Sequence, residues 1–248
     1  MKILVINPNT SEFVTRAVAA EAVRAASSGT EIEAVTGRKG AAIVSGRAEN
    51  AIAAVEAMEL AVEHSAGMDG IILAVSFDSG LPALRELLPI PVVGMSEAAM
   101  LTACMLGGRF SLVTFGNRAV PLYEELCNSY GLSSRLAGVL SLPPLSPDEM
   151  QNPILVVPKL AELIEEAVMT QRTEAVILAG AIFANISKEV ATAVSVPVVN
   201  GITAAVGMVE ALVRLGASKP RAGSYQLPAG KEVREVSPAL ATYFGKLP

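Results

Sequence analysis

A loop with three polar residues follows an apolar run in the stretch IILAVSFDSGLPALREL, residues 71–87. Ser76, Asp78 and Ser79 could supply a nucleophile, a hydrogen-bond donor and a base there. A serine hydroxyl becomes a nucleophile only when a base lies within reach, and Asp78 is the nearest candidate along the chain. A structural role is the alternative, because Asp78 and Ser79 also suit the N-terminal cap of a helix over LPALREL. A capping Asp78 would have a lowered pKa and would therefore be a weak base.

Two further polar loops suit the binding of a substrate. NPNTS, residues 7–11, offers side-chain amides, hydroxyls and backbone N–H groups at a helix start, which suit a carboxylate, imide or ureide oxygen. A simple turn and cap would use the same residue types. The loop TFGNR, residues 114–118, has a similar composition. From these two loops we expect the pocket residues Asn7, Asn9, Thr10, Ser11, Thr114, Phe115 and Gly116.

Short strands that alternate with amphipathic helices must position these loops. The apolar runs predict strands near residues 2–8, 31–36, 70–76, 91–95, 109–115, 136–142, 175–181 and 197–201. This alternation is typical of βαβ units on a parallel sheet, so we expect an α/β fold. In such sheets ligands bind at the carboxyl ends of the strands.

The chain also contains an internal repeat, in which residues 69–100 align with residues 173–206 and Pro91 matches Pro197. Two copies of one α/β unit are the economical interpretation. We therefore expect two pseudo-symmetric lobes, each a parallel sheet flanked by helices, with the active-site cleft between them. A pseudo-symmetric pocket can treat a substrate carbon from two faces, as removal and return of a proton require. Lobe 1 would comprise residues 1–94 and 207–248, and lobe 2 residues 95–206.

Composition narrows the classes of function. The 248 residues are 52% hydrophobic, the net charge is −5 and the basic residues are scattered, so we expect no nucleic-acid partner. No apolar run reaches membrane-spanning length and the first residues are unlike a signal peptide, so we expect a cytoplasmic protein without a membrane partner. Cys104, Cys127 and the single histidine, His64, form no cluster with ligand spacing, so no metal site is expected.

Several motifs occur in a fixed order along the chain: INPNTS at 6–11, DGIILA at 69–74, DSGLPALRE at 78–86, PVVGMSEAAM at 91–100, GGRFSLVT at 107–114, EAVILAGA at 174–181, VPVVNGITAAV at 196–206 and LGASKPRAGSY at 215–225. With them the chain resembles the aspartate/glutamate/hydantoin racemase superfamily, and most closely its hydantoin and allantoin racemase branch. The resemblance implies two α/β lobes, a small-molecule substrate and chemistry next to a carbonyl without a metal or organic cofactor. It also implies a homo-oligomer, because members are generally dimers or larger.

Members of the superfamily use two opposed cysteines, one in each lobe, and this chain has neither. In the ungapped alignment Val75 and Gly180 occupy the two positions, whereas a one-residue gap would place Ser76 at the first. The small residues that replace the second thiol would leave a wider second lobe, whose backbone N–H groups could form an oxyanion hole. The further residues expected around the pocket are Ser79, Ala181, Ile182 and Phe183, with Glu97 and Asn200 in supporting positions.

Three hypotheses about function remain open. The first is a cofactor-independent enzyme of the racemase and isomerase superfamily, which acts next to a carbonyl of a small cyclic imide or ureide, such as a hydantoin, or of an amino or carboxylic acid. Its catalytic residues would be Ser76 and Asp78 in place of thiols. The second is a decarboxylase, or an amide or ring hydrolase, on the same scaffold. The third is a protein that binds a small ligand without turnover.

Overall fold

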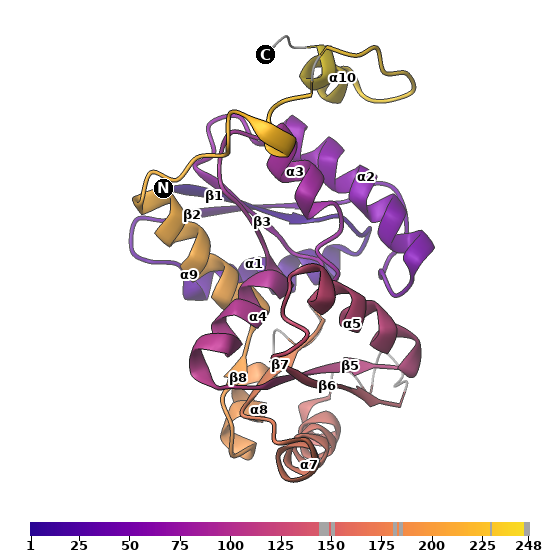
Figure 1. Ribbon diagram of the computed structural model, residues 1–248, viewed down its shortest axis with the longest axis vertical. Coiled ribbons are helices and arrows are strands. Elements are labelled where there is room, and N and C mark those ends of the chain that lie inside the picture. Colours follow the sequence, from indigo (N-terminus) through magenta and orange to yellow (C-terminus); the bar gives the residue numbers. More distant parts are fainter. Residues whose placement is uncertain (144–148, 150–151, 181–182, 184–185, 229, 246–248) are drawn as a thin grey trace.

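The computed structural model describes residues 1–143, 149, 152–180, 183, 186–228 and 230–245. Two four-stranded parallel sheets, each flanked by helices, form two lobes (Figure 1). This arrangement confirms the expected α/β class and the expected two lobes.

The sheet of lobe 1 has the strand order β2 (Glu31–Thr36), β1 (Lys2–Asn7), β3 (Gly70–Leu73) and β4 (Val92–Gly94). All neighbouring pairs are parallel. The helices of this half of the chain are α1 (Glu12–Ala25), α2 (Arg47–His64) and α3 (Leu81–Leu87). Parallel strands covered on both faces must be apolar throughout, and Ile3 to Ile6 of β1 are accordingly fully buried.

The sheet of lobe 2 repeats this topology with the order β6 (Leu136–Leu142), β5 (Phe110–Phe115), β7 (Ala175–Leu178) and β8 (Val198–Val199). Its helices are α5 (Val120–Ser129), α7 (Pro153–Gln171) and α8 (Ser187–Ala193), and the short 3-10 helix η1 (Asn117–Ala119) precedes α5. The equal strand orders support the proposal that one α/β unit was duplicated.

Two helices cross between the lobes. The helix α4 (Met95–Leu106) follows β4 but packs on β5, β7 and β8 of lobe 2, whereas α9 (Gly201–Arg214) follows β8 but packs on α1, β3 and β4 of lobe 1. The two helices also pack against each other. The chain thus returns to lobe 1 at Asn200, a few residues before the boundary at 207 that we proposed from the sequence.

Glu210 connects its helix, α9, to lobe 1 by hydrogen bonds. Its carboxylate accepts hydrogen bonds from the backbone N–H and the hydroxyl of Ser27, at 2.9 and 2.5 Å, and from the hydroxyl of Thr30 at 2.7 Å. Burial alone would raise the pKa of Glu210, but these hydrogen bonds lower it to about 2. The charged carboxylate is therefore the form that the fold stabilises.

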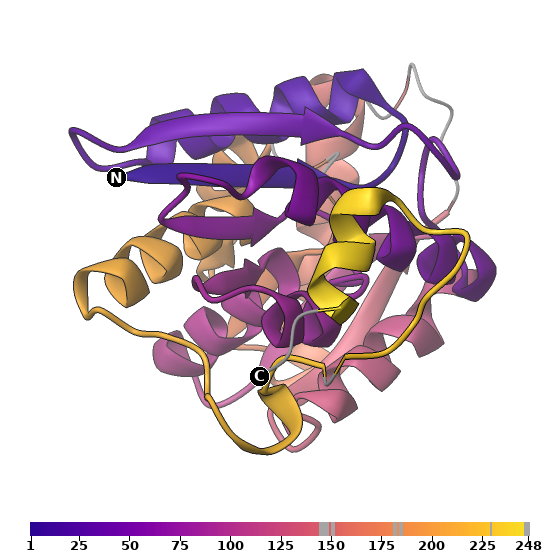
Figure 2. The same ribbon diagram turned by 90° about the horizontal axis from the view of Figure 1, so that it is seen from above.

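The C-terminal segment lies over lobe 1, as the view from above shows (Figure 2). After the 3-10 helix η3 (Gly223–Tyr225), the helix α10 (Pro238–Gly245) packs on α2 and buries Leu240 in the lobe 1 core. The backbone N–H of Ser237 donates to Glu59 of α2 at 3.1 Å. The segment thus adds a cover to lobe 1 over α2.

Candidate active site

A pocket lies between the lobes, at the carboxyl ends of the central strands β1, β3, β5 and β7. The empty space at the pocket is about 850 Å³, which includes a part that is open to solvent. Six of the residues predicted from the sequence line it: Asn9, Val75, Ser76, Thr114, Phe115 and Gly180. The other described lining residues are Val14, Ile43, Val44, Ser45, Ala74, Phe77, Ala119, Tyr123 and Ala179.

Ser76 and Tyr123 form a hydrogen bond across the lobe boundary, with 2.8 Å between their hydroxyl oxygens. The Tyr123 hydroxyl also lies 3.3 Å from the backbone carbonyl of Ala179, to which it can donate. The backbone carbonyl of Ser76 accepts a hydrogen bond from the hydroxyl of Ser96 at 2.6 Å. The pair therefore joins the end of β3 in lobe 1 to the end of β7 in lobe 2.

Tyr123 is a neutral hydroxyl at neutral pH. Burial raises the pKa of Tyr123 to about 12, against the opposing effect of its hydrogen bonds with Ser76 and Thr114. Its ring contacts Phe77, with 4.8 Å between the ring centroids. In its neutral form Tyr123 can donate a hydrogen bond to a partner that carries negative charge.

Asp78 does not line the pocket, so the structure does not support the prediction that it acts as a catalytic base. Its carboxylate accepts hydrogen bonds from the backbone N–H groups of Ser96 at 3.1 Å and Glu97 at 2.8 Å, and from the hydroxyl of Tyr130 at 2.7 Å. Ser96 and Glu97 lie in the first turn of α4, where a carboxylate interacts favourably with the helix dipole. Asp78 therefore caps α4, and not the helix α3 that follows it in sequence.

Gly94 leaves the space that the Asp78 carboxylate occupies. A Cβ atom at residue 94 would lie 2.4 Å from the Asp78 Cγ and 2.6 Å from each carboxylate oxygen. Asp78 itself has the left-handed backbone conformation, with a φ of +47°, which aspartate tolerates better than most residues. Burial raises the pKa of Asp78 to about 7, which corrects the expectation of a lowered pKa for a capping aspartate.

In the NPNTS loop, Asn9 lines the pocket, whereas Asn7, Thr10 and Ser11 do not. Asn7 is fully buried and donates to the hydroxyl of Thr15 at 2.9 Å and to the carbonyl of Ser11 at 3.2 Å. The backbone N–H of Thr10 donates to the carbonyl of Ala41 at 3.0 Å. Asn7 thus shapes the loop, and Thr10 holds the segment 37–46 beside it.

Two residues of the second lobe, Phe183 predicted as a pocket wall and Asn200 predicted as a supporting residue, have structural contacts. Phe183 is buried and stacks on Phe115, with 4.6 Å between ring centroids, and it is absent from the described lining of the pocket. Asn200 caps α9, because its side-chain oxygen accepts from the N–H groups of Ile202 at 2.9 Å and Thr203 at 3.1 Å. The predicted residues Ala181 and Ile182 lie outside the described part of the chain.

Ser79 and Glu97 are also structural. Ser79 is buried and its hydroxyl donates to the side-chain oxygen of Asn50. Glu97 forms an ion pair with Arg85, in which Nη1 of the guanidinium donates to Oε1 at 3.0 Å and Nη2 to Oε2. Neither side chain lines the pocket.

Sequence reasoning missed Tyr123 and the segment Ile43–Ser45. The sequence contains only a weak indication that Tyr123 points inward. Every fourth residue from 119 to 127 is apolar or aromatic, which is the spacing of one helix face, and these residues, Ala119, Tyr123 and Cys127, are buried. No sequence pattern indicated that the segment around Ile43 would line the pocket. Its place depends on contacts between distant parts of the chain, such as the bond from Thr10 to Ala41.

The two cysteines lie away from the pocket. Burial raises the pKa of Cys127 to about 11, and Cys127 packs in the core of lobe 2. In the described part of the chain, no group of histidine, cysteine and acidic side chains could hold a metal ion. A search of the same residues finds no helix with the length and hydrophobicity needed to span a membrane.

The pocket combines apolar walls with hydroxyl and amide groups. Asn9, Ser45, Ser76, Thr114 and Tyr123 are its polar side chains, and none of its described lining residues is charged at neutral pH. An ionic substrate would lose its hydration there without gaining a partner of opposite charge from these residues. The described lining therefore suits an uncharged ring with carbonyl and N–H groups.

Two α/β lobes of equal topology, with a pocket between the carboxyl ends of their central strands, define the class of protein. The sequence model of the Asp/Glu/Hydantoin racemase family matches residues 3–209, so the chain belongs to this family. The hydantoin racemases of Pseudomonas sp. (strain NS671) and Paenarthrobacter aurescens are 32% identical over 233 residues and 33% identical over 236 residues. These alignments cover 94% of this chain, and 94% and 99% of the two relatives.

A solved structure gives the same result. The allantoin racemase from Klebsiella pneumoniae superposes with a TM-score of 0.89 at 34% sequence identity, and the alignment covers 98% of each chain. The resemblance inferred from the sequence motifs is confirmed.

Proposed function

We propose that the chain is an enzyme that acts on a small hydantoin-like ring, at the carbon next to a carbonyl, with hydroxyl groups in place of thiols. The similarity to hydantoin and allantoin racemases supports the substrate class. The single observation that carries the proposal is the Ser76–Tyr123 hydrogen bond at the pocket. It provides a proton path between two hydroxyls beside the first thiol position of the superfamily, which falls on Val75 without a gap and on Ser76 with a one-residue gap.

The proposed reaction begins with the ring between the two lobes. Asn9 and Thr114 hydrogen-bond to its polar edge. In the small fraction of molecules in which Tyr123 is ionised, Ser76 takes the proton from the carbon and passes its own proton to Tyr123. The electron pair of the C–H bond remains on the ring as an enolate. Donors in a desolvated pocket stabilise the enolate oxygen more than they would in water. Ser76 then returns a proton to the same face of the carbon and takes back the proton of Tyr123, which restores both groups. Exchange of the Ser76 or Tyr123 proton with solvent before this return gives isotope exchange at the carbon.

In this mechanism Val75 and Gly180 only make room for the ring. Val75 is buried and Gly180 has a φ of +151°, a conformation that a side chain would strain. Asp78 holds the loop that carries Ser76, by its bonds to α4 and Tyr130. It thus acts as a positioning residue.

A second candidate function is binding without turnover. It is favoured by the side chains of the pocket, because the described lining contains no carboxylate, imidazole, amine or thiol. Such a protein would keep the fit for the ring and lack a base of ordinary strength.

We also propose a cytoplasmic homo-oligomer that needs no metal or organic cofactor. The family similarity and exposed apolar side chains on α4, such as Met105, support self-association. Sedimentation velocity would test the oligomer directly.

Proton NMR in deuterium oxide, with 5-substituted hydantoins, allantoin, aspartate, glutamate and arylmalonates, tests the proposal. We expect loss of the signal of the proton next to the carbonyl for a hydantoin or allantoin. Ring opening or loss of carbon dioxide would reassign the reaction. If the folded protein binds a ring and changes none of these signals, binding without turnover is the function.

A further inference from the structure

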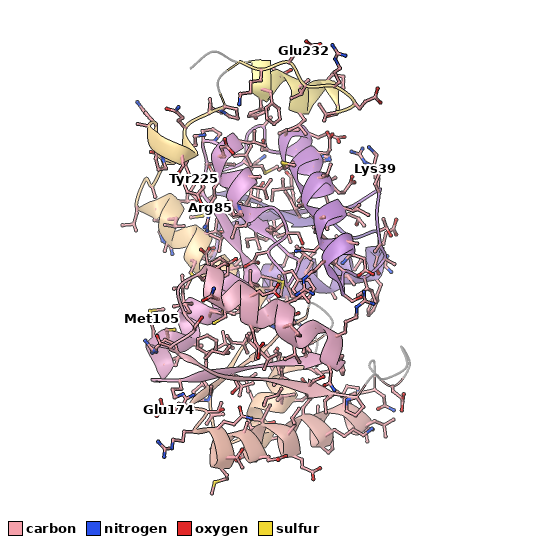
Figure 3. All side chains as sticks on the ribbon, turned by 45° about the vertical axis from the view of Figure 1, so that its right-hand side comes forward. Lys39, Arg85, Met105, Glu174, Tyr225 and Glu232 are labelled. Carbon is pink, nitrogen blue, oxygen red and sulfur yellow. The ribbon has the colours of Figure 1, made fainter. Side chains whose placement is uncertain are left out.

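A second pocket lies on lobe 1 and shares no lining residue with the first. It is open to solvent and is lined by residues of α3, the start of β4 and the two residues before it, the end of α9 and the segment 217–225. The residues that matter are Arg85, Val92, Leu212, Lys219 and Tyr225. Arg85 and Tyr225 lie near each other on this face of lobe 1 (Figure 3).

The lining of this pocket is apolar with two cations. Arg85 and Lys219 are in its described lining, whereas Glu97, which pairs with Arg85, and Glu86, which lies near Lys219, are not. The described lining therefore carries two cationic side chains and no carboxylate. An anion in the pocket would therefore lie closer to these two cations than to the carboxylates outside the lining, and its attraction to the cations would be the stronger interaction.

Both cations keep donors for a ligand. Three guanidinium nitrogens of Arg85 donate, Nε to the carbonyl of Val92 at 3.0 Å and Nη1 and Nη2 to Glu97. A guanidinium has five N–H bonds, so two remain. The ammonium of Lys219 donates to the backbone carbonyl of Glu86, which fixes its place and uses one of its three N–H bonds.

We propose that this pocket is a second ligand site, for a small carboxylate with an apolar body. The carboxylate would bind between Lys219 and Arg85, since charge-assisted hydrogen bonds are stronger than neutral ones. The apolar body would contact Val92, Leu212 and the ring of Tyr225. Tyr225 is 37% exposed, so part of its ring is available to contact a ligand.

The second site is connected to the first through the start of α4. Arg85 pairs with Glu97, whose backbone N–H donates to Asp78, and the neighbouring Ser96 donates to the carbonyl of Ser76. A carboxylate that draws Arg85 away from Glu97 therefore acts on the turn that supports Ser76. We expect the backbone amide signals of Ser76 and Ser96 to move when the second site fills.

Calorimetry and ¹⁵N NMR with phenylacetate test the proposal on the full chain. We expect Lys219→Met to weaken phenylacetate binding at least tenfold, while Lys231→Met, a change at an exposed lysine outside the pocket, leaves it unchanged. Phenylacetamide, which has the same shape without the charge, should bind at least tenfold more weakly. Ser76→Ala should bind phenylacetate normally, which separates this site from the first.

Equal binding by the Lys219→Met and Lys231→Met variants would overturn the proposal. So would equal affinity for phenylacetate and phenylacetamide, or loss of binding in Ser76→Ala, which would place the ligand in the first pocket. None of these readouts depends on turnover, so failure here is distinguishable from failure of the proposed function.

Discussion

Ser76 and Tyr123 come from different lobes, yet their hydroxyl oxygens lie 2.8 Å apart at the pocket. The relationship depends on both sheets, because Ser76 follows β3 and Tyr123 lies on α5. A hydrogen bond between the two lobes at this point allows a proton to move between them without a water molecule. It is the feature on which the proposed chemistry depends.

Replacement of Tyr123 by Phe removes the hydroxyl and keeps the ring that contacts Phe77. We expect the rate of exchange on a hydantoin to fall at least tenfold. The free energy of unfolding should fall by only about 1–2 kcal/mol, because one hydroxyl is lost and the carbonyl of Ala179 loses a donor. Exchange kinetics and denaturant titration measure the two effects. An unchanged rate would show that the Tyr123 hydroxyl has no part in the reaction.

The pH dependence of exchange identifies the base. With the pKa of Tyr123 at about 12, the ionised fraction rises tenfold for each pH unit below that value. The enzymatic rate, after subtraction of the rate with Tyr123→Phe, should therefore rise with a slope near 1 from pH 7 to pH 10. A plateau above pH 7 would instead point to Asp78, whose pKa is about 7.

Replacement of Gly94 by Ala should destabilise the protein by roughly 2–3 kcal/mol, because the new Cβ overlaps the Asp78 carboxylate, which three hydrogen bonds hold in place. The matched control is Gly207→Ala in α9, where a Cβ meets no atom within 4 Å. Because alanine favours a helix over glycine, the control should gain about 0.5–1 kcal/mol. Urea titration measures both. Equal stability of the two variants would contradict the assigned contact.

Asp78 should make stability fall as pH rises. Its pKa is raised from 3.8 to about 7 in the folded state, so between these values the folded state binds a proton that the unfolded state has lost. The stabilising effect is complete below pH 4 and is lost as pH rises through 7. Unfolding titrations from pH 5 to pH 8 should show this decline for the native chain and a smaller one for Asp78→Asn. Parallel curves would show that Asp78 has an ordinary pKa in the folded state.

The sequence predicted the parts of the fold that depend on local pattern. Strands that are buried on both faces read as apolar runs, and polar residues lie at their carboxyl ends, where the pocket residues Asn9, Ser76 and Thr114 are found. The fate of Asp78 was not predictable in this way. Its partner helix α4 begins 17 residues later, after a strand, and the fit depends on Gly94. Tyr123 reaches the pocket only because the second lobe packs against the first.

The contacts of Phe183 were also not predictable from local sequence pattern. Its position after a strand suggested a wall of the pocket, but a large apolar side chain gains more free energy in the core, where it stacks on Phe115. The sequence pattern at the end of a strand does not determine whether an apolar side chain packs in the core or lines the pocket.

The most direct measurement is the rate of deuterium incorporation at C5 of 5-benzylhydantoin, by the native chain and by Ser76→Ala, at a ring concentration that saturates both. Native protein should incorporate deuterium, and Ser76→Ala should do so at least tenfold more slowly while it still binds the ring. Equal rates for the two proteins, or no incorporation by folded native protein that binds the ring, would contradict proton transfer through Ser76.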